Sequence, residues 1–195
     1  MKVIEQNKDV ESKLLHIFDL VNDWLRFAEA KNGALLAFCS ACIFGLLKFP
    51  NDWITITSSF RAGLVVAIVF LLLAILICVW SFFPQITRIE VMLWPLTDEC
   101  KETDNFLFFG DICTYSVEDL FDRLCERYST PFDFSQHQKQ YLHDLANQII
   151  VNSKITMRKF RLFQRALGFV FCCIPAFFIS WGIVAVLQHC FIGGF

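Results

Sequence analysis

Two cationic side chains in the last quarter of the sequence, Lys154 and Arg158, have the spacing expected of an anion site. Residues four apart lie on one face of a helix, so both groups could reach one phosphate. An upstream segment, 105–111, carries two aromatic rings that could stack on a base, flanked by an amide and a carboxylate. The candidate ligand-binding residues are therefore Asn105, Phe108, Phe109, Asp111, Lys154 and Arg158.

Both halves of this candidate site also have a simpler interpretation. Lys154 and Arg158 belong to a basic run, 154–165, that ends at the edge of an apolar segment. Basic residues in that position anchor membrane helices and contact anionic lipid. The aromatic residues of 105–111 could equally form a hydrophobic core. The residues alone leave these alternatives open.

Other reactive side chains do not form a recognisable catalytic or metal-binding pattern. Cys39 and Cys42 form a C-x-x-C pair within an apolar run, without the second pair that a zinc site requires. His137 and His143 are six residues apart and point to different faces of a helix. The sequence also lacks G-x-S-x-G, H-E-x-x-H and G-x-x-x-x-G-K motifs. We therefore expect a non-enzymatic protein without a metal or a cofactor, apart from a possible nucleotide ligand.

Three apolar runs are long enough to cross a bilayer: Gly33 to Phe49, Ala62 to Phe83 and Ala166 to Leu187. A membrane helix needs about 17–25 predominantly apolar residues. None of the three runs contains an acidic residue, and proton-coupled or ion-coupled transporters usually need buried charge. The sequence predicts an all-α integral membrane protein with three transmembrane helices and a mainly helical cytoplasmic insert between helices two and three.

The basic residues predict the orientation of the chain. Five precede the first run, ten lie in the insert, and none follows the third run. Because basic residues are retained in the cytoplasm, the N-terminus and the insert should be cytoplasmic and the C-terminus external. The expected divisions are a cytoplasmic amphipathic helix (1–32), the first span (33–49), an external loop (50–61), the second span (62–83), the insert (84–165), the third span (166–187) and an external tail (188–195).

Local signals predict helices on the cytoplasmic side. Apolar residues recur at three- and four-residue steps from Leu14 to Ala28, a pattern that runs on into the first span. Ser116 is a suitable N-cap for a helix over 117–128. Ser135 and Gln138 form a capping box for a helix that runs toward Arg165 and can continue into the third span. Segment 86–94 could be a β segment or an extension of the second span.

Small residues form a stripe along the first span, and charged residues precede it. The stripe consists of Gly33, Ala37, Ala41 and Gly45, and the third span has a similar one in Gly168, Cys172, Ala176 and Ser180. Small residues let helices approach closely in lipid. The stripes could pack the helices of one subunit or join subunits of a homo-oligomer. Arg26, Glu29 and Lys31 mark the expected juxtamembrane switch.

Three segments resemble a known family. Residues 24–34, W-L-R-F-A-E-A-K-N-G-A, resemble the R-F-A-x-x-K-x-G entry of the transmembrane effectors of Pycsar anti-phage systems. F-F-G-D-I at 108–112 resembles that family's segment after the second span, and 145–154 resembles its final cytoplasmic helix. The order and spacing fit across residues 14 to 190. Trp24 and Asn32 depart from the family's familiar pattern, which could indicate a divergent branch with another ligand or partner.

The resemblance implies a role in the bacterial inner membrane, with 50–61 and 188–195 in the periplasm. Such effectors respond to a cyclic nucleotide made by a companion cyclase during infection, and they impair the membrane so that growth stops. Direct DNA binding is not expected. The alternatives are a non-enzymatic accessory subunit of an RNA-guided nuclease or of a channel and, more remotely, a membrane-tethered enzyme.

Overall fold

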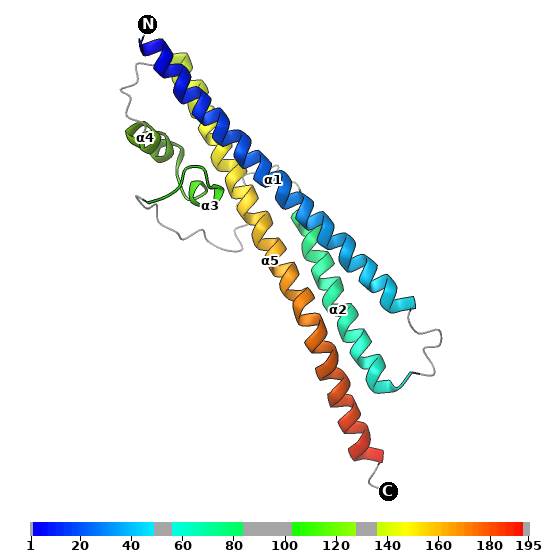
Figure 1. Ribbon diagram of the computed structural model, residues 1–195. Helices are drawn as coiled ribbons and strands as arrows, with labels where there is room; N and C mark the ends of the chain where they lie inside the picture. Colours follow the sequence, from blue (N-terminus) through cyan, green and yellow to red (C-terminus); the bar gives the residue numbers. More distant parts are fainter. Residues whose placement is uncertain (1, 49–55, 84–102, 128–135, 193–195) are drawn as a thin grey trace. The chain divides into compact units, whose positions relative to one another are not determined.

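The computed structural model describes residues 2–48, 56–83, 103–127 and 136–192, and within these ranges the regular secondary structure is all helical, without strands. Its elements are α1 (Lys2–Lys48), α2 (Ser58–Ser81), α3 (Phe109–Ile112), α4 (Val117–Arg127) and α5 (Gln136–Ile192) (Figure 1). The described helices include three that are long and apolar enough to cross a membrane, within Val10–Lys48, Ser58–Ser81 and Lys139–His189. The predicted all-α class with three candidate spans is confirmed.

The chain divides into two compact units. The insert unit contains Met1–Ala28 and Gln85–Phe160, and the span unit contains Glu29–Pro84 and Arg161–Phe195. Helices α1 and α5 each contribute residues to both units. Gly33 does not interrupt α1, because backbone hydrogen bonds satisfied in lipid favour an unbroken helix.

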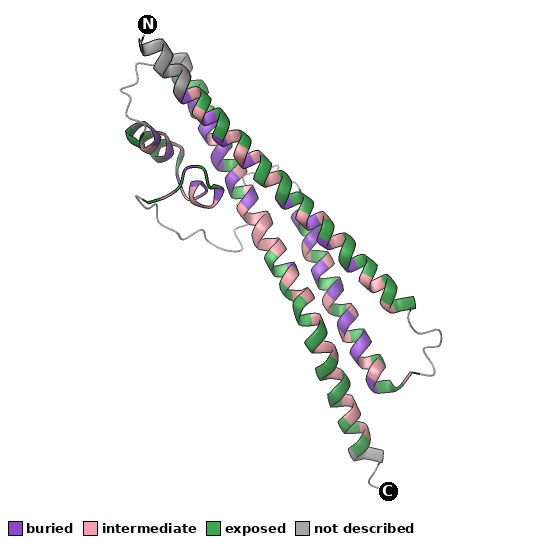
Figure 2. Ribbon diagram, in the orientation of Figure 1, coloured by how far each residue is buried: buried purple, intermediate pink, exposed green. Residues whose placement is uncertain are grey.

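The insert unit has a hydrophobic core built from α1, α4, α5 and the segment before α4. Helix α1 buries residues at three- and four-residue steps, the period that places them on one face. Helices α4 and α5 bury matching faces against them (Figure 2). The fully or nearly fully buried members include Leu14, Ile17, Val21, Phe106, Phe109, Ile112, Tyr115, Leu120, Leu142, Ala146, Ile149 and Ile150.

A polar contact joins α1 and α5 within this unit. The Nδ2 amide of Asn152 donates a hydrogen bond to Oδ1 of Asn22 at 2.8 Å. One turn further along α5, the Thr156 hydroxyl donates to the Asn152 carbonyl oxygen at 2.7 Å. Because burying an amide is unfavourable unless it is hydrogen-bonded, the pair favours one register of the two helices.

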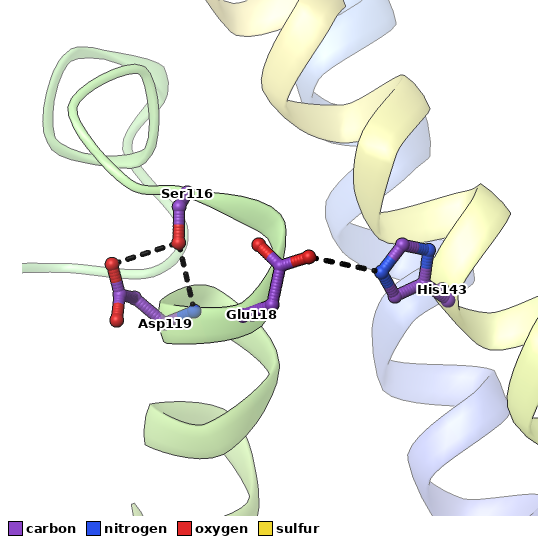
Figure 3. A network of polar contacts seen from close by, with 4 residues as sticks. All are labelled: Ser116, Glu118, Asp119 and His143. Carbon is purple, nitrogen blue, oxygen red and sulfur yellow. Dashed lines mark hydrogen bonds and ion pairs between the residues drawn. The ribbon is translucent and has the colours of Figure 1, made fainter.

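Ser116 caps α4, as predicted. Its Oγ accepts the backbone N–H of Asp119 at 3.1 Å and donates to the Asp119 carboxylate at 2.7 Å (Figure 3). Glu118 in the same first turn approaches Nε2 of His143 on α5 at 3.5 Å. Ser135, the predicted cap of the capping box before α5, and the segment 86–94 lie outside the described residues.

In the span unit, α2 packs through small side chains. Its buried positions are Ser59, Gly63, Leu64, Ala67, Leu71, Ala74, Cys78 and Ser81. At Gly63 a Cβ atom would lie 2.9 Å from the ring of Phe177 on α5. The Phe177 ring also meets that of Phe60 edge to face, with centroids 5.4 Å apart. Glycine therefore permits a close helix contact in this unit.

The opposite faces of these helices expose large apolar side chains. Phe38 on α1, Leu76 on α2 and Phe171 on α5 are all mostly exposed within the chain. Exposed apolar surface of this extent is typical of helices that face lipid. This distribution agrees with a membrane location for the span unit.

Candidate functional site

Side-chain oxygens hold the loop that precedes α3 in a fixed shape. The Asp111 carboxylate accepts the backbone N–H of Asn105 at 2.8 Å. Oδ1 of Asn105 in turn accepts the backbone N–H of Leu107 at 3.0 Å. Asn105 and Asp111, two of the six predicted ligand-binding residues, thus have a structural role in this segment. Their side-chain oxygens accept hydrogen bonds from backbone N–H groups that would otherwise need water.

Phe109 lies in the hydrophobic core, with 5% of its surface exposed. Its ring stacks on that of Phe160 from α5, with centroids 5.3 Å apart and 14° between the planes. The Trp24 ring of α1 also contacts the Phe109 ring, with centroids 5.6 Å apart. A ring covered in this way offers no free face to a base, so for Phe109 the hydrophobic-core interpretation describes the observed position.

Phe108 lies differently, with 41% of its surface exposed. Its ring is 4.8 Å from that of Phe109, and it covers Gly110 so closely that any Cβ atom there would collide with the ring. Gly110 therefore permits the turn that separates the two phenylalanines, one buried and one exposed. Phe108 remains sterically available for stacking.

Phe108 and Phe109 belong to an aromatic cluster with Trp24, Phe27 and Phe160, all in the insert unit. Trp24 and Phe27 are 39% and 47% exposed, so one side of the cluster is open to the surroundings. The cluster brings together the R-F-A segment and the F-F-G-D-I segment, which are distant in sequence. Their shared aromatic contacts give both segments a common structural role.

The two predicted cations do not join this cluster. Lys154 is exposed on α5, and Arg158 is partly buried one turn further along. In the part of the chain that the structure describes, no hydrogen bond, ion pair or ring contact connects either cation to Asn105, Phe108 or Asp111. The two hydrogen bonds and the contact between the adjacent phenylalanine rings thus lie within segment 105–111, and none of them includes Lys154 or Arg158.

A second set of contacts, centred on Asp104, was not apparent from the sequence. The Arg127 guanidinium donates to the Asp104 carbonyl oxygen at 2.8 Å and lies 5.1 Å from the centroid of the Phe106 ring. The Tyr115 hydroxyl donates to the Asp104 carboxylate at 2.9 Å. These contacts fasten the loop to both ends of the α4 region.

The expected juxtamembrane switch residues lie along α1, where the chain passes from one unit to the other. Arg26 of the insert unit forms an ion pair with Asp23 at 3.6 Å, with both side chains largely exposed. Exposed pairs of this kind contribute at most about 1 kcal/mol. In the span unit, Nζ of Lys31 lies 5.6 Å from the centroid of the Phe163 ring, and Glu29 is exposed.

The small-residue stripe of the first span faces outward. Ala37, Ala41 and Gly45 are exposed, whereas Leu35 and Cys39 occupy the buried seam of α1. Gly33 is half-buried, and a Cβ atom there would meet only the Phe82 ring at 4.0 Å. Packing within one subunit therefore does not account for the three exposed positions.

Four of the described cysteines lie in or against the hydrophobic core of the span unit: Cys39, Cys42, Cys78 and Cys173. All four are free thiols. Within the described ranges, no group of three or more His, Cys, Asp or Glu side chains is arranged to hold a metal ion. These thiols act as small, polarisable packing groups.

Three candidate spans combined with a separately packed helical insert define the chain as a multi-span helical membrane protein. The model of the Pycsar effector protein domain matches residues 13–187. The chain belongs to this family, which confirms the resemblance seen in its segments. It is 33% identical over 179 residues to Pycsar effector protein RsPycTM of a Rhizobium species, covering 86% of this chain and 95% of that relative. No solved structure gives a significant match.

Family membership makes the protein a membrane effector of Pycsar anti-phage defence, a system that includes a cyclase. The matched region contains the aromatic cluster, Lys154 and Arg158 of α5, and the outward-facing stripe. The site residues predicted from the sequence thus all lie within the part of the chain that the family model matches, whatever their individual roles.

Proposed function

We propose that the protein perturbs the inner membrane when a cyclic nucleotide from the companion cyclase binds its insert unit. The observation that supports this proposal is that α1 and α5 each contribute residues to both units. Because each helix is continuous, a change in its packing within the insert unit can alter its packing among the spans. A ligand can shift the equilibrium between two packing arrangements of α1 and α5 only if it binds one arrangement more tightly than the other. The effector itself would perform no catalysis.

The proposed topology has the insert and N-terminus in the cytoplasm and the C-terminus in the periplasm. Its support is the absence of basic residues after the third run and their number in the insert. In this orientation, a nucleotide made in the cytoplasm reaches the insert directly. A periplasmic alkaline phosphatase fused after Phe195 should be active, and one fused after Met1 inactive; the reverse pattern would contradict the topology.

The proposed active form is a homo-oligomer joined through the stripe. Its support is the exposure of Ala37, Ala41 and Gly45 on a helix that must otherwise face lipid. Close helix approach at such positions improves van der Waals packing, which drives association where the hydrophobic effect is absent. Rearrangement of subunits along this face would open a path through the bilayer.

Dye release from proteoliposomes tests the proposed function directly. The full chain is reconstituted at a fixed protein-to-lipid ratio with a self-quenching dye inside, and each common 3′,5′-cyclic nucleotide is added in turn. At least one nucleotide should release dye beyond the ligand-free control. Complete retention with every nucleotide would overturn a ligand-gated leak and would favour the accessory-subunit alternative.

A paired substitution tests the ligand residues expected from the sequence. Lys154→Gln combined with Arg158→Gln removes the two predicted ligand cations without removing a described core contact. If they bind the phosphate, the nucleotide concentration for half-maximal release should rise roughly tenfold or more. An unchanged concentration would exclude this pair from the ligand site and would leave the proposed function intact.

A further inference from the structure

The insert unit contains a pocket that none of the assignments above uses. It has a volume of about 360 Å³ and is lined by Ser12, Lys13, His16 and Ile17 of α1 together with Leu107 of the loop before α3. Small-molecule sites usually have volumes of about 300–1,000 Å³. The pocket is therefore large enough for a small ligand.

The α1 side of the pocket presents its polar groups on one face. Lys13 and His16 are three residues apart, and Ser12 and His16 are four apart, so their side chains project together from the helix. Ile17 is 3% exposed and belongs to the hydrophobic core, as does Leu14 one position beyond Lys13. The core contacts thus hold this face of α1 in position.

The loop side of the pocket is also held in place. The backbone N–H of Leu107 donates a hydrogen bond to Oδ1 of Asn105. The backbone N–H of Asn105 in turn donates one to the Asp111 carboxylate. Phe106, immediately before Leu107, is buried in the same core as Leu14 and Ile17. Both walls are therefore fixed by contacts independent of a ligand, and preformed sites lose less entropy on binding.

The lining chemistry suits a phosphate ester. The Lys13 ammonium, the Ser12 hydroxyl and an N–H of His16 can each donate a hydrogen bond to a phosphate oxygen. Ile17 and Leu107 provide an apolar wall beside them, suitable for a sugar or a base. Among the described residues that line the pocket, none is acidic, so none would repel an anion.

We propose that this pocket binds the phosphate of the activating nucleotide, an assignment that rests on the proposed function above. Lys13 supplies the cationic contact, Ser12 and His16 add hydrogen bonds, and Leu107 covers the ligand from the loop. Lys154 and Arg158 line no part of this pocket. Binding would tie α1 to the loop that ends at Phe108, and this gives the ligand a direct effect on the position of α1.

Equilibrium binding to the full chain in detergent tests the assignment. Each labelled 3′,5′-cyclic nucleotide is titrated against wild type, Lys13→Gln and Leu107→Glu. The first variant removes the cation, and the second places a carboxylate on a wall that is 46% exposed and so does not disturb the core. The matched control is Lys139→Gln, an exposed lysine of α5 in the same unit.

We expect Lys13→Gln to bind roughly ten- to hundredfold more weakly, the range for loss of a charge-assisted contact. Leu107→Glu should also bind more weakly because its carboxylate repels the phosphate, and the control should bind as wild type does. Circular dichroism should show the same helical content for all four proteins. Equal nucleotide affinity of wild type and Lys13→Gln would overturn the pocket assignment without contradicting the proposal that the protein binds a nucleotide.

Inorganic phosphate separates failure of the pocket from failure of the proposed function. If no cyclic nucleotide binds wild type, the function fails, but phosphate binding that Lys13→Gln weakens would still support an anion pocket. If nucleotide binds and only the Lys154→Gln, Arg158→Gln variant loses it, the function stands and the pocket assignment is wrong.

Discussion

The ring of Phe109 stacks on the ring of Phe160, which lies much later in the chain, with centroids 5.3 Å apart and planes 14° from parallel. This contact ties the start of α3 to the part of α5 that belongs to the insert unit. It also explains the different positions of two adjacent phenylalanines, because the partner ring covers Phe109 and leaves Phe108 outside.

Phe109→Ala should destabilise the insert unit strongly. Removing a buried phenylalanine ring leaves a cavity and typically costs about 3–5 kcal/mol in the free energy of unfolding. Phe108→Ala is the matched control, because this neighbouring ring is 41% exposed and its loss should cost much less. Thermal unfolding in detergent, followed by circular dichroism, measures both. Equal losses from the two variants would contradict the assignment of Phe109 to the core.

Gly63→Leu should disrupt the packing of α2 against α5 within the span unit. A Cβ atom at Gly63 would already lie 2.9 Å from the Phe177 ring and 3.1 Å from its backbone oxygen, so a larger side chain must separate the helices. Overpacking of this kind typically costs about 1–3 kcal/mol. Gly168→Leu is the control, because nothing beyond the adjacent backbone of its own helix lies within 4 Å of a Cβ there. A melting temperature lowered equally by both substitutions would argue against a specific α2–α5 contact.

Ala41→Leu should weaken self-association while leaving the subunit folded. Ala41 is exposed on α1, so a larger side chain fits within one chain but prevents a second helix from approaching closely. The oligomer should therefore shift toward monomer in analytical ultracentrifugation in detergent. Gly182→Leu, which adds a side chain where nothing lies within 4 Å of a Cβ, should leave the distribution unchanged. A wild-type distribution for Ala41→Leu would remove the stripe from any interface.

The helices could be predicted from the sequence because their signals are local. Apolar run length identified the three candidate spans, and Ser116 identified the start of α4. The faces through which the helices pack are harder to predict from the sequence, because small residues spaced four apart occur on α1 and on α2 alike. Only the rotation of each helix toward its neighbours places Gly63 inside and Ala41 outside.

The candidate site was less predictable for a related reason. Phe108 and Phe109 have the same side chain, and the turn at Gly110 together with a distant partner ring determines which one is buried. Lys13 and His16 look like the ordinary polar face of an amphipathic helix. They become part of a pocket only because Leu107, from a loop far away in sequence, lies beside them.

The Asn22–Asn152 pair allows a test of how α1 and α5 are coupled in the insert unit. Asn22→Leu should destabilise the unit by about 1–3 kcal/mol, because it leaves the partly buried Asn152 amide without its 2.8 Å partner. Replacing both residues with Leu should recover most of that loss, since two apolar groups of similar shape leave no donor or acceptor unpaired. Thermal unfolding of the wild type, both single variants and the double variant measures the four stabilities that a double-mutant cycle needs.

If the hydrogen bond fixes the register of the two helices, the double variant should recover most of the lost stability yet require a different nucleotide concentration for half-maximal dye release. Additive losses of stability, with no change in that concentration, would show that the pair neither interacts energetically nor influences the response.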